Sequence, residues 1–191
     1  MLDFLDDYAL CCFNGAPSVF PELPAERTQI IMPALDPFRT KNAPLSEVEG
    51  RVLLTNCGID PTRSLICQVS RFGRWKNPWQ AIDIYRLVKP QIPSVQLALV
   101  GAMEAADDVD AQDVLSSVQA YAQGDPAIHL LSDPQMITHR EVNAFQRYAS
   151  VILQRSSREG FGLTVTEAMW KHQPVIRNFS DRIARANQAW I

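Results

Sequence analysis

Long apolar runs are missing from this 191-residue sequence, and no segment approaches the roughly 20 apolar residues that a membrane-spanning helix needs. The N-terminus, residues 1–7, is acidic and lacks the basic start of a secretory signal peptide. The formal net charge is only −3, so electrostatics give no reason to expect nucleic acid or an anionic membrane as partner. These absences favour a cytoplasmic protein that binds neither.

Cysteine and histidine are scarce, with four and three copies. The cysteines form no Cys-x-x-Cys pair, and the histidines lie far from them in the sequence. Zinc and redox chemistry therefore have little support, and reduced, mostly buried thiols are the better interpretation. The cysteines are Cys11, Cys12, Cys57 and Cys67, and the histidines are His129, His139 and His172.

What is present is the composition of an ordinary globular domain, with 47% hydrophobic and 20% charged residues. From about residue 63, segments of strand and helix character alternate. Such repeats predict an α/β fold with a doubly wound parallel sheet. The expected strands cover residues 65–69, 95–100, 127–131 and 151–154, with a fifth beginning at 174.

Capping signals mark where several helices begin. Residues 46–49 and 138–141 are capping boxes, and Asn77-Pro78 combines an N-cap residue with a first-turn proline. Two further helices are expected around residues 114–121 and over residues 163–171. The first 62 residues are punctuated by prolines and are expected to be mainly connecting segments.

Two loops follow strands of the predicted sheet, and both should open at the carboxyl edge, where such sheets bind ligands. In the first loop, S-R-F-G-R-W-K, Arg71 and Lys76 stand after a strand and just before a helix N-terminus. Backbone N–H groups and the helix dipole favour an anion there, and the two cations would suit a diphosphate. The alternative is a solvated basic turn.

The second loop places two glutamates eight positions apart. Glu159 precedes the predicted helix, and Glu167 lies about one turn inside it. Gly160 and Gly162 allow the backbone to approach a ligand and supply N–H donors. Glu167 could accept hydrogen bonds from ribose hydroxyls, and Glu159 could face a transferred sugar. The alternative is that both are surface charges.

The stretch E-G-F-G-L-T-V-T-E-A-M-W-K, residues 159–171, resembles the Glu-x7-Glu motif of retaining glycosyltransferase family 4. Residues 140–171, 93–101 and 30–42 and the S-R-F-x-x-W-K loop are similar to the trehalose synthases of that family, which join a nucleotide-activated glucose to glucose. The resemblance covers nearly everything from about residue 28 to residue 176.

Position by position, the resemblance implies a nucleotide-sugar site. Arg71 and Lys76 would hold the donor diphosphate and stabilise the leaving group. Glu159 would lie by the donor sugar, and Glu167 would bind the ribose. The backbone groups that line the phosphate and the sugar would be those of Phe161, Gly162 and Leu163. The donor would be UDP-, ADP- or GDP-glucose, with no metal and no cofactor.

The resemblance also implies a division of the chain. Residues 41–176 would be the Rossmann-like donor domain of a GT-B enzyme, and residues 1–40 the end of the acceptor domain and a linker. Residues 177–191 are unlike the family and would form a tail, leaving the donor domain incomplete. Uncovered sheet edges and apolar helix faces would then offer surfaces for self-association.

We therefore expect a donor domain of a retaining glucosyltransferase that is inactive alone. The alternative is a non-catalytic folded remnant or a partner-binding fragment. A nicotinamide-dependent dehydrogenase fits poorly, because no G-x-G-x-x-G follows a predicted strand. Trp79 and Trp170 stand at helical positions, where we expect core packing, and the histidines match no catalytic position of the family.

Overall fold

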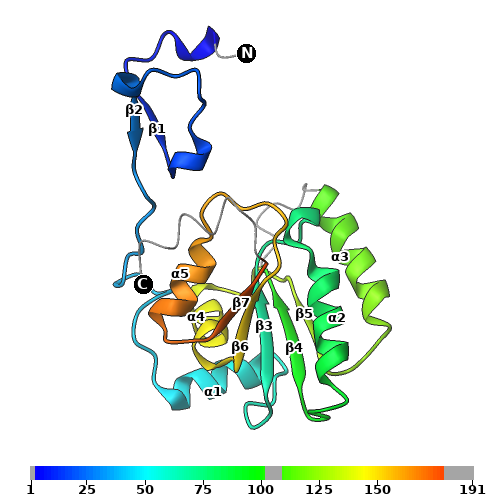
Figure 1. The fold of residues 1–191 in the computed structure, drawn as a ribbon. Coiled ribbons are helices and arrows are strands. Elements are labelled where there is room, and N and C mark those ends of the chain that lie inside the picture. The colour runs from blue at the N-terminus through cyan, green and yellow to red at the C-terminus, as the bar shows by residue number, and fades with distance from the viewer. Residues whose placement is uncertain (1–2, 102–108, 179–191) are drawn as a thin grey trace.

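The computed structural model describes residues 3–101 and 109–178, and within them a five-stranded parallel sheet carries helices on both faces (Figure 1). The strand order is β5–β4–β3–β6–β7. Because the order reverses direction at β3, the sheet is doubly wound, and the predicted α/β class is confirmed. The strands are β3 (Leu65–Val69), β4 (Gln96–Val100), β5 (Ile128–Leu131), β6 (Val151–Gln154) and β7 (Val175–Arg177).

The helices divide between the two faces of the sheet. The first face is covered by α2 (Pro78–Val88) and α3 (Val109–Ala122). The other is covered by α1 (Glu47–Asn56), α4 (His139–Tyr148) and α5 (Leu163–Trp170). Figure 1 shows the sheet between these two layers.

Alternation along the strands builds a separate core layer on each face. Every residue of β3 and β4 is buried, as expected for central strands of a sheet covered on both sides. Cys67 packs in the layer beneath α1, α4 and α5, whereas the neighbouring Ile66 packs in the layer beneath α2 and α3. Tyr85 and Phe145 are fully buried anchors of the two helical layers.

The helix starts agree with the capping signals in two cases and differ in one. The boxes over residues 46–49 and 138–141 are both formed reciprocally. Asn77 occupies the N-cap position of α2, but its side chain makes no capping bond. The reason is a left-handed backbone at Asn77, with φ 50°, and its Nδ2 donates instead to Gln80 Oε1 at 3.1 Å.

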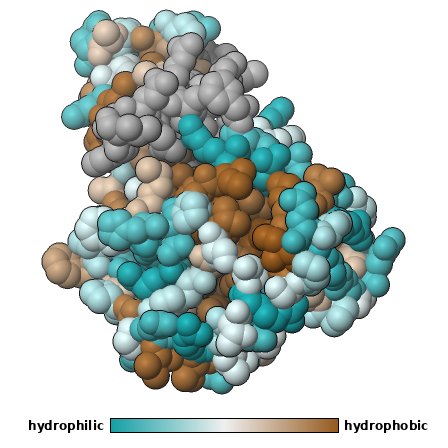
Figure 2. Space-filling view, turned by 60° about the horizontal axis from the view of Figure 1, so that its bottom comes forward, coloured by the Kyte–Doolittle hydropathy of each residue, from teal (hydrophilic) through white to brown (hydrophobic). Residues whose placement is uncertain are grey.

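The N-terminal segment, residues 3–45, lies mostly apart from the main sheet (Figure 1). It contains a parallel pair that the sequence did not predict, β1 (Cys11–Phe13) and β2 (Thr28–Ile30). Arg27 stabilises the start of the segment, because its guanidinium donates to Leu5 O at 2.5 Å and to Tyr8 O at 2.7 Å. Several large apolar side chains of this segment are exposed. Figure 2 shows hydrophobic patches on one face of the whole molecule, within a mostly hydrophilic surface.

The remaining expectations concern particular residue types. All four cysteines are free thiols, and three of them are buried, as predicted. Trp79 packs against the core layer beneath α2, as expected. The expectation for Trp170 is wrong, because α5 turns Val165 and Ala168 inward and leaves Trp170 53% exposed. In the part of the chain that the structure describes, no helix has the length and apolar character to cross a membrane.

Candidate functional site

The two loops singled out in the sequence meet at the carboxyl edge of the sheet. They leave β3 and β6, which are neighbours in the sheet. The Ser157 N–H donates to Trp75 O at 2.8 Å, which joins the loops through the backbone. The Arg158 guanidinium lies 4.3 Å from the centre of the Trp75 ring, which adds a cation–π contact. The predicted juxtaposition of the loops is therefore present.

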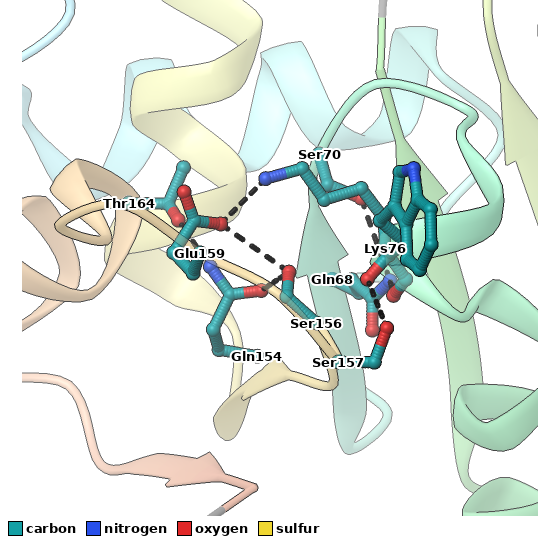
Figure 3. A network of polar contacts seen from close by, with 9 residues as sticks. Gln68, Ser70, Lys76, Gln154, Ser156, Ser157, Glu159 and Thr164 are labelled. Atoms are coloured by element: carbon teal, nitrogen blue, oxygen red, sulfur yellow. Dashed lines mark hydrogen bonds and ion pairs between the residues drawn. The ribbon is translucent and has the colours of Figure 1, made fainter. Parts of the chain in front are cut away.

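An ion pair between Lys76 and Glu159 forms the centre of the contact between the loops (Figure 3). Lys76 Nζ lies 2.5 Å from Glu159 Oε2, and the side chains are 22% and 17% exposed. Ser156 Oγ lies 3.3 Å from the same carboxylate oxygen. Because the Lys76 ammonium already contacts a carboxylate, an anionic ligand at this edge would compete with Glu159 for it.

Two buried glutamines at the strand ends hold these loops in place (Figure 3). Gln68 of β3 donates Nε2 to Lys76 O at 2.9 Å. Gln154 of β6 donates to Thr164 Oγ1 at 2.9 Å and accepts from Ser156 Oγ at 2.8 Å. Sequence reasoning missed both residues, although a single polar side chain near the carboxyl end of an apolar strand was a readable signal.

Arg71 follows β3 but does not join the ion pair. Its side chain is exposed, and within residues 3–101 and 109–178 it makes no hydrogen bond or ion pair. Its backbone is fixed by Gly101, the residue after β4. A Cβ at Gly101 would lie 1.9 Å from Ser70 O and 3.3 Å from Arg71 Cα, so only glycine permits this close approach.

The start of α5 completes the carboxyl edge. Gly162 stands at the N-cap position with φ 88°, a left-handed conformation that favours glycine, and no side chain caps the helix. Uncapped amides at a helix N-terminus attract anions. The neighbouring Phe161 is buried, whereas the side chain of Leu163 is 43% exposed. These three backbone positions therefore stand at the end of the loop that carries Glu159, where α5 begins.

Glu167 lies in α5, about one turn inside the helix as predicted, but belongs to a different network. It is only 7% exposed. Its Oε2 accepts from Gln146 Nε2 of α4 at 2.9 Å and lies 3.0 Å from Lys41 Nζ. No contact among the described residues joins it to Glu159 or Lys76.

Lys171 joins Glu167 and Lys41 as a third charged residue of this network. It is 3% exposed, and its Nζ donates to Gln146 Oε1 at 2.7 Å and to Asn42 Oδ1 at 3.1 Å. Burial lowers the pKa of Lys171 to about 8, while the nearby Glu167 carboxylate acts in the opposite direction. Gln146, Lys171 and Asn42 were not identified from the sequence. Gln146 could have been, because it follows Val142 by one helical turn on the inward face.

Comparison with known proteins places the chain in a family. Residues 55–181 match the sequence model of the glycosyl transferases group 1. The chain belongs to this glycosyltransferase family. Trehalose synthase from Rubrobacter xylanophilus is 46% identical over 147 residues, which cover 77% of this chain and 35% of that protein. Trehalose synthase from Thermococcus litoralis is 44% identical over 173 residues, which cover 91% of this chain and 42% of that protein.

Solved structures agree with this assignment at the level of fold. A trehalose-6-phosphate synthase superposes with a TM-score of 0.69 at 15% identity, covering 98% of this glycosyltransferase chain and 48% of that protein. A second structure, trehalose-6-phosphate from E. coli bound with UDP-2-fluoro glucose, superposes with a TM-score of 0.69 at 17% identity. The match covers 97% of this chain and 49% of that chain. The GT-B fold and the resemblance to trehalose synthases are confirmed. The chain spans about two fifths of the length of the curated relatives above.

Proposed function

We propose that this chain binds a nucleotide-activated glucose, as the donor domain of a retaining glucosyltransferase of the trehalose synthase kind. The observation that carries the proposal is the meeting of Lys76 and Glu159 at the carboxyl edge, on two loops whose sequences carry the family motifs. The relationship to trehalose synthases and the fold shared with a protein bound to UDP-2-fluoro glucose support it.

In this proposal, different residues at the carboxyl edge bind different parts of the nucleotide sugar. Arg71 and Lys76 bind the diphosphate, and their positive charge stabilises the leaving group as the bond to the sugar breaks. The backbone groups of Phe161, Gly162 and Leu163 line the phosphate and the sugar. Glu159 exchanges its contact with Lys76 for hydroxyls of the donor sugar, and Glu167 accepts from the ribose. The cations and the N-terminus of α5 neutralise the diphosphate without a resident metal.

Calorimetric titration with UDP, ADP and GDP tests donor binding. Charge-assisted hydrogen bonds contribute about 1.5–3 kcal/mol each, so Arg71→Ala should weaken binding of the preferred nucleotide at least tenfold. Arg74→Ala is a matched control, because Arg74 is also an exposed arginine of the same loop. If both variants lose the same affinity for the nucleotide, Arg71 contributes only through its general positive charge and not through a specific contact. A non-catalytic remnant, the second candidate, would give no heat with any of the three nucleotides.

The separate roles of the glutamates are tested with and without the sugar. Glu167→Gln should weaken plain nucleotide and nucleotide-glucose alike, because the ribose is common to both. Glu159→Gln should weaken only the nucleotide-glucose. If both changes act equally on the plain nucleotide, this division of roles is wrong.

We also propose that residues 1–191 alone do not join glucose to glucose. Transfer requires an acceptor held against the donor in a closed, water-excluding site, and a single donor domain supplies only one wall of it. Purified chain incubated with nucleotide-glucose and glucose should therefore form no trehalose detectable by chromatography. Trehalose above the protein-free control, lost in Glu159→Ala, would show that two copies of the chain complete the site.

Three earlier predictions stay predictions. One is self-association, supported by exposed apolar side chains such as Phe38, which is 92% exposed, and sedimentation would measure it. Another is the cytoplasmic location. The third is the division into residues 1–40, 41–176 and a tail of residues 177–191, of which residues 179–191 lie outside the described residues.

A further inference from the structure

The buried network around Glu167 holds only one of the two oxygens of its carboxylate. Gln146 Nε2 and Lys41 Nζ both contact Oε2, at 2.9 and 3.0 Å. Within the described residues no hydrogen bond is made to Oε1. One oxygen is therefore committed to the protein, and the second retains its capacity to accept a hydrogen bond.

The direction of the Gln146 amide follows from the chemistry of Lys171. An ammonium group donates hydrogen bonds and accepts none, so the amide end that faces Lys171 Nζ at 2.7 Å must be the oxygen. The amide nitrogen is then turned toward Glu167. Gln146 is fully buried and Lys171 is 3% exposed, so water does not compete for these bonds. Lys171 thus determines which end of Gln146 meets the carboxylate.

The same ammonium anchors the segment that supplies Lys41. Lys171 Nζ donates to Asn42 Oδ1, and Asn42 Nδ2 donates to Asp36 O at 2.9 Å. From α4, Asn143 Nδ2 donates to Thr40 O and Ala43 O at 3.1 and 2.9 Å. Lys41 is therefore held from both sides, next to the carboxylate whose charge it balances.

We propose that Lys171 and Gln146 are positioning residues for Glu167, which orient its carboxylate so that one oxygen is left for the ribose hydroxyls of the nucleotide. This inference rests on the proposed function, which places the ribose at Glu167. Neither residue needs to touch the nucleotide. Through these two residues, recognition of the ribose depends on a buried lysine, whereas binding of the phosphates does not.

The test compares each nucleotide with its 2′-deoxy form, because only the hydroxyl contact differs. The full chain is titrated with UDP and 2′-deoxy-UDP, or with the ADP or GDP pair if that base binds more tightly. One hydrogen bond to a charged group corresponds to roughly tenfold preference for the ribonucleotide. Lys171→Met and Gln146→Met should reduce the preference to less than about threefold and leave affinity for the deoxynucleotide nearly unchanged.

Two controls separate positioning from a general structural role. Tyr148→Phe removes a hydrogen bond from α4 to Leu45 O without removing a contact to Glu167 or to the residues that flank Lys41, and it should keep the preference for ribose. The double variant Glu167→Gln with Lys171→Met should lose no more preference than Glu167→Gln alone, because the two residues act through one contact. Gln146→Met leaves Lys171 and its bond to Asn42 Oδ1 in place, so it provides a second measurement even if Lys171→Met does not fold.

The outcomes distinguish this inference from the function on which it rests. If the parent chain binds none of the nucleotides, or if Glu167→Gln keeps the preference for ribose, the ribose assignment fails and the inference fails with it. If Glu167→Gln loses the preference but Gln146→Met keeps it, only the positioning role is overturned. Equal loss of affinity for both sugar forms in Gln146→Met would also overturn it, because that is the mark of a structural defect.

Discussion

The two polar networks that hold Glu159 and Glu167 are built on different supports. Lys76 and Glu159 stand on loops, with side chains 22% and 17% exposed. Glu167, Gln146 and Lys171 stand on or directly after the packed helices α4 and α5, and each is less than a tenth exposed. If the proposed function holds, a ligand would exchange partners with the loop pair at little structural cost, whereas the packed helix network would already hold its carboxylate in place.

The largest effect should come from breaking the support of the loop network at Gly101. In Gly101→Ala the added Cβ would lie 1.9 Å from Ser70 O, so strand and loop must separate. We expect a loss of about 3 kcal/mol in the free energy of unfolding, measured with denaturant, together with weaker nucleotide binding. Gly73→Ala is the control in the same loop, because its Cβ would lie an ordinary 3.9 Å from Lys76 Cγ. Equal losses in both variants would contradict the steric account.

The buried Lys171 of the helix network should make the free energy of unfolding depend on pH. Below about pH 8, Lys171 is protonated in the folded and unfolded chains, and the burial penalty is fully present. Between about pH 8 and the ordinary lysine value of 10.5, the unfolded chain binds more protons than the folded chain. The contribution of Lys171 to the free energy of unfolding should therefore rise with pH by about 3 kcal/mol across this window.

Comparison with Lys171→Met isolates that contribution. Burial raises the pKa of the Cys57 and Cys67 thiols, which makes stability fall with pH over part of the same range in both proteins. Denaturant unfolding at several pH values between 7 and 10.5 gives the difference between parent and variant. A difference that does not change with pH would mean that Lys171 keeps an ordinary pKa.

A smaller effect is expected from Gln154, which supports the loop network from the end of β6. Gln154→Met removes its bonds to Ser156 and Thr164 while keeping much of the side-chain volume. The free energy of unfolding should fall by about 1–2 kcal/mol. Affinity for nucleotide-glucose should also fall, because the loop that carries Glu159 loses its hydrogen bonds to the end of β6. An unchanged affinity would show that the Glu159 loop does not depend on Gln154.

The smallest effect belongs to the exposed contact between the loops. Arg158→Ala removes the guanidinium from the Trp75 ring, which is itself 55% exposed. Cation–π contacts at exposed sites contribute about 0.5–1 kcal/mol, so thermal unfolding should show a small decrease. A loss as large as that in Gln154→Met would mean that this surface contact, and not the buried glutamine, holds the loops together.

The elements of the sheet were predictable because their signals are local. The apolar runs 65–69 and 151–154 match β3 and β6, and the capping boxes match the starts of α1 and α4. The meeting of the two loops also followed from the sequence, because parallel strands present their carboxyl ends at one edge. Each of these features depends on residues that lie close together in the sequence.

The partners within the site were not predictable in the same way. That Lys76 contacts Glu159 and that Glu167 contacts Lys41 depends on how distant segments pack. Lys41 and Asn42 stand in the proline-punctuated stretch that was expected to be mainly connecting segments, yet they join the helix network, and Asn42 is buried. The β1–β2 pair was missed because its strands are three residues long and stand among prolines, where alternation gives no signal.

The central position of β3 has a consequence for the order in which the chain can fold. On one side β3 pairs with β4, and β4 with β5, so these three strands form by joining segments that follow one another in sequence. On its other side β3 pairs with β6, which comes after β4 and β5 in the chain, so this pairing joins segments that are more distant in the sequence. Closing that longer loop costs more conformational entropy. We expect the half of the sheet that ends in β5 to form early and to act as the template on which β6, β7 and the Glu159 loop assemble.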